Sequence, residues 1–68
     1  KLLTRYGQRI RELRLKKGMT QQELAVELDM EKSSISRLEA GKKNSKLTTL
    51  SKVAAALGVN LSELLKID

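Results

Sequence analysis

Apolar residues recur at helical spacing along the chain, and the strict alternation typical of strands appears nowhere. At about 100° per residue, all apolar side chains of the first segment except Leu15 fall within one arc, with Arg14 at its edge. The members of this arc are Leu2, Leu3, Tyr6, Ile10 and Leu13. Later segments have inner faces of the same kind: Leu24, Ala25 and Leu28; Leu47, Leu50, Val53, Ala54 and Leu57; and Leu61, Leu64 and Leu65. The pattern predicts an all-α domain.

Glycines and polar capping residues mark where these helices end and begin. Gly18, Gly41 and Gly58 each follow a helical run, as a left-handed C-terminal cap does. Residues 20–23 have the pattern of a capping box, and residues 60–63 repeat it. These signals predict five short helices. Gly7 lies inside the first of them, where we expect it to cost about 1 kcal/mol relative to Ala.

Residues 20–41 contain two short helical segments joined by a break of about three residues. Ala25 is small where the two helices would touch, and Asp29 tolerates the positive φ that so tight a turn needs. On a helical wheel of the second segment, Ser34, Ile35 and Leu38 point inward. Its outward arc has no acid and no large apolar group, and consists of Lys32, Ser33, Ser36 and Arg37.

Glu39 falls on the apolar side of that second segment, an unfavourable place for a carboxylate without a cation. Arg14, at the edge of the first segment's apolar arc, is a suitable partner. We therefore predict a buried ion pair between Arg14 and Glu39.

Length and composition restrict the chemistry that the chain can carry out. Its 68 residues support one small domain, and they include no Cys and no His. A disulfide framework and a thiolate zinc site are therefore excluded, and the commonest metal ligand and general base is missing. Ser–Lys chemistry is the one nucleophilic option left for an enzyme, which we do not expect, and no cofactor is implied. Because the chain begins with Lys, we expect it to be part of something longer.

The longest apolar run, Val53 to Leu57, is far shorter than the roughly 20 residues that a membrane span needs. The chain also does not open with a charged and then apolar signal sequence. We therefore expect a cytoplasmic protein with no membrane partner.

The net charge of +6 is unevenly distributed along the chain. Residues 1–17 carry seven bases and one acid, residues 18–41 two bases and five acids, and residues 42–46 three lysines. Within the first block, Arg5, Arg9 and Lys16 form a basic stripe that we expect to face solvent or a phosphate. A basic excess of this kind favours polyanions, although a merely soluble surface has the same composition.

Along nearly its whole length the chain resembles the Cro/CI-type (Xre-like, phage-repressor) helix-turn-helix family. The matching positions are Ile10 to Arg14, Lys17 to Gln21, Glu23 to Ala25, Leu28, Ile35 to Glu39, Gly41, Lys42, Leu47, Leu50, Ala56 to Val59, Glu63 and Leu64. The resemblance implies a compact five-helix, λ-repressor-like domain spanning residues 1–68, with its helix-turn-helix at about residues 20–39. The chain departs from the family pattern at three places: Asp29 replaces a turn Gly, Glu31 a Ser or Thr cap, and Ser45-Lys46 a Pro-Ser or Pro-Thr.

The resemblance also implies how double-stranded DNA would be bound. The helix from Lys32 to Glu39 would enter the major groove, with Lys32, Ser33, Ser36 and Arg37 contacting bases. Phosphates would be bound by Thr20, Gln21, Lys42, Lys43 and Lys46, and Gln21 would also brace the recognition helix. The alternative interpretation is that these lysines and arginines are ordinary solvated side chains and that Gln21 is only a good helix former.

One such domain covers few base pairs, so we expect a homodimer on a pseudo-palindromic operator, acting as a repressor or an autoregulatory control protein. The implied dimer surface is the last helix, at Leu61, Leu65 and Ile67; the alternative is that these residues belong to the core. Two other functions remain open. One is a DNA-binding antitoxin with a toxin partner, and the other is a scaffold that holds a co-regulator or another protein.

Overall fold

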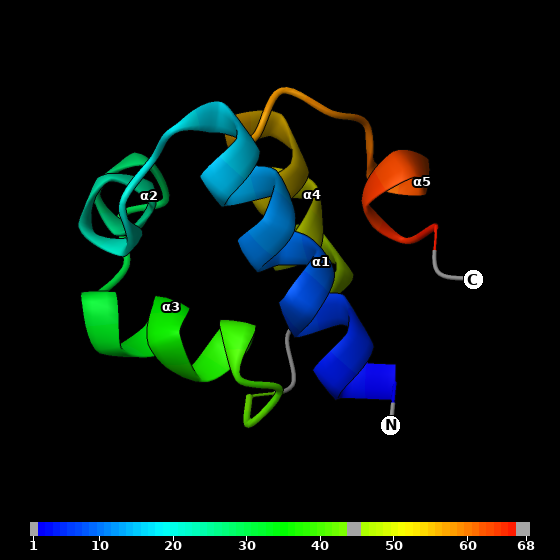
Figure 1. Ribbon diagram of the computed structural model, residues 1–68, viewed down its shortest axis with the longest axis horizontal. Helices are drawn as coiled ribbons and strands as arrows, with labels where there is room; N and C mark the ends of the chain where they lie inside the picture. Colours follow the sequence, from blue (N-terminus) through cyan, green and yellow to red (C-terminus); the bar gives the residue numbers. More distant parts are fainter. Residues whose placement is uncertain (1, 44–45, 67–68) are drawn as a thin grey trace.

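The computed structural model describes residues 2–43 and 46–66, which form five helices and no strand. The helices are α1 (Leu2–Lys17), α2 (Gln21–Glu27), α3 (Lys32–Glu39), α4 (Leu47–Ala56) and α5 (Leu61–Leu64). Helix α1 runs between α3 on one side and α5 on the other, and it packs against both (Figure 1). The predicted all-α, five-helix fold is confirmed.

Each helix contributes one large, fully buried apolar side chain to a single core. These side chains are Ile10, Leu24, Ile35, Val53 and Leu64. Leu13, Leu28, Leu50 and Leu61 pack partly against this cluster. The predicted inner faces are therefore those that the molecule buries, although the side chains of Leu2 and Leu3 lie outside the described part.

Leu47 is an exception, because it was predicted to face the core and is 61% exposed. It is the first residue of α4, and the buried side chains of that helix, Val53 and Ala54, come two turns later. The start of α4 thus projects beyond the core that the described residues form.

The ends of α1, α2, α3 and α4 form as the capping signals predict. Thr20 Oγ1 accepts a hydrogen bond from the Glu23 amide at 3.0 Å, and the Thr20 amide donates to Glu23 Oε1 at 2.8 Å. Gly18, Gly41 and Gly58 have φ values of 78°, 75° and 75°. Asp29 has a φ of 55°, as predicted, and supplies the left-handed turn between α2 and α3. This turn is closed by the Met30 amide, which donates to the Ala25 carbonyl at 2.9 Å.

The second predicted capping box is only half formed. Asn60 Oδ1 accepts from the Glu63 amide at 2.7 Å. Within the described part of the chain, the Glu63 side chain makes no return bond to the Asn60 amide. Instead, the Ser62 hydroxyl donates to Asn60 Oδ1 at 2.9 Å. Helix α5 therefore has one of the two reciprocal bonds that start α2.

Gly7 has a tertiary role that helix propensity does not reveal. A Cβ at this position would lie 2.5 Å from the Glu39 carbonyl oxygen and 2.6 Å from that of Leu38. The backbone of α1 thus passes directly over the C-terminal end of α3. The cost predicted for a glycine inside a helix is offset here, because only a residue without a Cβ lets the backbone of α1 come this close to α3.

Candidate nucleic-acid interface

The outward face of α3 is polar and basic, and it is free for contact with a ligand. Lys32, Ser33, Ser36 and Arg37 are all exposed, while Ile35 and Leu38 on the opposite side are buried. No side-chain hydrogen bond within the described residues involves any of the four exposed residues. Glu31 is the N-cap of α3, and its side chain makes no capping bond.

A buried ion pair holds the C-terminal end of α3 against α1. Arg14 Nε donates to Glu39 Oε2 at 2.6 Å, and Arg14 Nη2 donates to Glu39 Oε1 at 3.1 Å. Both residues are only 6% exposed. Arg14 Nη1 also donates to the Met19 carbonyl at 2.7 Å, so all three guanidinium nitrogens are bonded. This is the pair that the sequence predicts.

Gln21, the first residue of α2, binds the same carboxylate. Its Nε2 donates to Glu39 Oε1 at 3.1 Å. Glu39 therefore accepts two bonds from α1 and one from α2. The pitch of α3 is set by these three bonds together with the buried Ile35 and Leu38.

A polar cleft of about 460 Å³ lies beside this ion pair. Its lining combines residues of α1, α2 and the C-terminal half of α3: Arg11, Arg14, Gln21, Ser36, Glu39 and Ala40. Sequence reasoning did not single out Arg11. The signal was present, because Arg11 stands three residues before Arg14 and so shares a side of α1 with it.

The predicted phosphate-binding residues differ in how available they are. Thr20, Lys42 and Lys46 are exposed, whereas Gln21 and Lys43 are half-buried. The Thr20 amide and one lone pair of its hydroxyl are engaged in the capping box, which leaves the hydroxyl proton for another acceptor. Lys46 is the N-cap of α4 and makes no side-chain capping bond.

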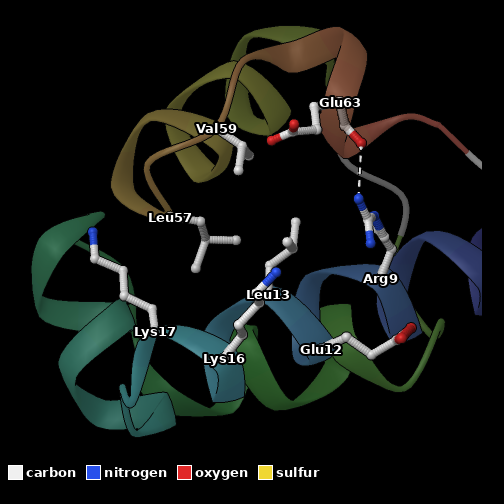
Figure 2. A pocket seen from close by; sticks show the side chains of 8 residues that line it. All are labelled: Arg9, Glu12, Leu13, Lys16, Lys17, Leu57, Val59 and Glu63. Atoms are coloured by element: carbon white, nitrogen blue, oxygen red, sulfur yellow. Dashed lines mark hydrogen bonds between the residues drawn. The ribbon is translucent and has the colours of Figure 1, made fainter.

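A second cleft, of about 630 Å³, lies where α1 faces α5 and the end of α4 (Figure 2). Leu13, Leu57 and Val59 point into it. Arg9 Nη2 donates across it to the Glu63 carbonyl at 3.4 Å, and Lys17 Nζ donates to the Ala56 carbonyl at 2.8 Å.

The position of Arg9 corrects the predicted basic stripe. Arg5 and Lys16 are exposed as expected, but Arg9 is half-buried and its guanidinium lies against α5. The helical wheel placed Arg9 on the correct side of α1. It could not show that the short α5 folds back over that side.

The predicted dimer surface is only partly described. Leu61 and Leu65 are half-buried, and Leu61 packs against the core, whereas Ile67 lies outside the described residues. Among the residues whose side chains the structure describes, the large apolar side chains that are clearly exposed lie elsewhere: Leu15, Val26 and Leu47. The part of the chain that the structure describes contains no helix long and apolar enough to cross a membrane.

Comparison with known families accounts for this arrangement. A family profile described as helix-turn-helix matches residues 10–64, which include α2, the turn at Asp29 and α3. The chain belongs to the helix-turn-helix family.

Helix-turn-helix proteins similar to this chain include two control proteins. One is the control protein C.BamHI of Bacillus amyloliquefaciens, which is 41% identical over 61 residues, covering 88% of this chain and 75% of the relative. The other is the control protein C.MunI of a Mycoplasma species, which is 38% identical over 61 residues, covering 88% of this chain and 82% of the relative.

A solved structure has both a similar sequence and a similar fold. It is the restriction-modification controller protein C.AhdI from Aeromonas hydrophila, with 39% identity and a TM-score of 0.87. The match covers 91% of this chain and 94% of that one. Together these matches confirm the predicted helix-turn-helix family and fold, and they place the chain among regulators of transcription.

Proposed function

We propose that residues 1–68 act as a single DNA-binding domain that reads an operator as a homodimer, in a repressor or autoregulatory control protein. The observation that carries this proposal is the outward face of α3. Four exposed polar or basic side chains lie on a helix whose orientation is set by the Arg14–Glu39 ion pair. The similarity to control proteins of restriction-modification systems supports the autoregulatory role.

In the proposed complex α3 lies in the major groove. Arg37 donates two hydrogen bonds to O6 and N7 of a guanine, and Lys32 donates to another guanine. Ser33 and Ser36 are short and act as donor or acceptor, so they contact either a base or a phosphate. The lack of an acid among these four residues suits the negative potential of the groove.

Register on the duplex comes from phosphate contacts, which carry no sequence information. Thr20 and Gln21 contact one phosphate from the start of α2. Lys42, Lys43 and Lys46 contact the backbone from the segment between α3 and α4. Because Gln21 is also bonded to Glu39, the phosphate that it binds is directly linked to the orientation of α3.

Two copies bind one operator, with their α3 helices about 34 Å apart in successive major grooves. Leu61 and Leu65, together with Ile67, form the proposed contact between the copies. The half-buried state of Leu61 and Leu65 leaves apolar surface on α5 for this contact.

Selection of binding sites from a random duplex pool, at about 150 mM salt, tests the proposal. Non-specific attraction fades at that salt concentration while base contacts persist. We expect enrichment of a two-fold-symmetric motif with half-sites about 10 base pairs apart and at least one guanine in each half. If a folded chain enriches no sequence, the proposal is wrong and a protein-binding role gains support.

Two substitutions separate base contacts from phosphate contacts. Arg37→Ala is expected to relax discrimination at one base pair of each half-site by about 1–3 kcal/mol. Lys42→Ala is expected to weaken binding to all duplexes alike and to lower the salt slope by about 1 per bound chain. Fluorescence anisotropy on the selected duplex and its single-base variants measures both effects. Identical behaviour of the two variants would contradict this division of roles.

A further inference from the structure

The polar cleft beside the ion pair belongs to the surface that the proposed function places against DNA. Its lining includes Ser36, which is on the outward face of α3, and Gln21, which begins α2. Arg11 lines the same cleft from α1. A duplex docked on α3 and on the start of α2 would therefore pass close to Arg11.

The charges in this cleft leave one cation without a partner. Glu39 is the only acidic residue of the lining, and its two oxygens accept three hydrogen bonds from Arg14 and Gln21. The charge of Glu39 is thus neutralised by Arg14. Arg11 is exposed, and within the described residues its guanidinium makes no ion pair and no hydrogen bond.

The other polar groups of the cleft are also able to donate. Gln21 Nε2 uses one proton for Glu39 and has a second, and the Ser36 hydroxyl proton has no acceptor within the described residues. Ala40 and Ser36, which line the same cleft, are small side chains. A guanidinium, an amide and a hydroxyl around one cavity are suited to an oxyanion such as a phosphate.

We propose that Arg11 binds a backbone phosphate of the DNA in this cleft. The inference rests on the proposed DNA-binding function and adds a contact from α1 to those from α2, α3 and the following lysines. As a phosphate contact, Arg11 contributes affinity and register and carries no base preference.

The test compares Arg11→Ala and Arg11→Lys with a matched control, Lys16→Ala. Lys16 is exposed on the same helix and its substitution removes the same charge, but it lines the other cleft, where α1 faces α5. The dissociation constant of each variant for the selected duplex is measured by fluorescence anisotropy across a salt series. Circular dichroism checks folding, which we expect to be unchanged because Arg11 is exposed.

Arg11→Ala is expected to lower the salt slope by about 1 per bound chain and to weaken binding about three- to tenfold at low salt. Its ranking of single-base variants should match that of wild type. Arg11→Lys should keep most of the slope because it keeps the charge, and Lys16→Ala should keep nearly all of it.

The outcomes that overturn the inference differ from those that overturn the proposed function. If wild type binds the duplex and Arg11→Ala keeps its salt slope, Arg11 binds no phosphate and the proposed function stands. If Lys16→Ala lost as much salt slope as Arg11→Ala, the loss would come from the lower net charge of the chain and not from a contact of Arg11. That result would also overturn the inference. A wild-type chain that binds no DNA overturns both.

A free phosphate ion could bind the same cleft as a backbone phosphate of DNA, because the two have the same chemistry. A titration distinguishes these two ligands. DNA-free wild type is titrated with inorganic phosphate while amide shifts are recorded by NMR. We expect no saturable binding, because a single exposed guanidinium holds a free anion weakly in water. Saturable binding that Arg11→Ala abolishes, together with an unchanged salt slope, would assign the cleft to a free anion.

Discussion

The Glu39→Ala variant is expected to lose about 3–5 kcal/mol of unfolding free energy, because it leaves the Arg14 guanidinium buried without its counter-ion. Arg14 Nε and Nη2 would lose their acceptors, and only the bond from Nη1 to the Met19 carbonyl would remain. Gln21 would lose its bond to α3 in the same variant. A domain of this size has a total stability on the order of 3–10 kcal/mol, so the variant would lose a large share of its stability.

Urea denaturation followed by circular dichroism measures this loss. The control is the double variant Arg14→Met with Glu39→Leu, which removes both charges and fills the space with apolar groups. We expect it to recover most of the stability, because well-packed apolar residues replace a buried ion pair without a large cost. A loss below about 1 kcal/mol in Glu39→Ala would mean that water reaches Arg14 and that the pair does not hold α3.

Gly7→Ala is expected to destabilise the domain by about 1–3 kcal/mol, although alanine is the better helix former by about 1 kcal/mol. The new Cβ would lie 2.5 Å from the Glu39 carbonyl oxygen, which is backbone and cannot rotate away. Helix α1 would have to move off the end of α3, which would stretch the Arg14–Glu39 bonds. DNA affinity should fall together with stability, because α3 would lose its fixed orientation.

Thermal unfolding of Gly7→Ala and of Gln8→Ala separates packing from propensity. Gln8 is the next residue along α1 and is exposed, so its substitution should change stability by no more than about 0.5 kcal/mol. If Gly7→Ala raised the melting temperature, propensity would dominate and the close approach of α1 to α3 would be wrong.

The sequence predicted those features that depend on residues near one another along the chain. Helix ends follow from local signals such as Thr20 with Glu23, or Gly41 after α3, and the structure has them where expected. The contact between Arg14 and Glu39 is long-range, but it too could be predicted from the sequence, because a carboxylate on an apolar helix face requires a cation. One suitable arginine stood at the edge of the neighbouring face.

The features that sequence reasoning missed depend on where other helices lie in space. Periodicity gives the side of a helix but not the extent of the core beneath it, so Leu47 was placed inside. Arg9 was expected to face solvent or a phosphate because nothing local shows that α5 covers it. Gly7 was given a propensity cost because its close approach to α3 is purely tertiary, and Arg11 was passed over because the cleft joins three helices.

The outward face of α3 is decoupled from the bonds that orient the helix. Lys32, Ser33, Ser36 and Arg37 form no hydrogen bonds with other described side chains, while Glu39, Ile35 and Leu38 hold the helix from the other side. Surface substitutions of this kind usually change stability by no more than about 0.5 kcal/mol. Under the proposed function, substitutions at these four positions change the recognised site at little cost to folding, so that related chains with one scaffold can diverge to serve separate operators in the same cell.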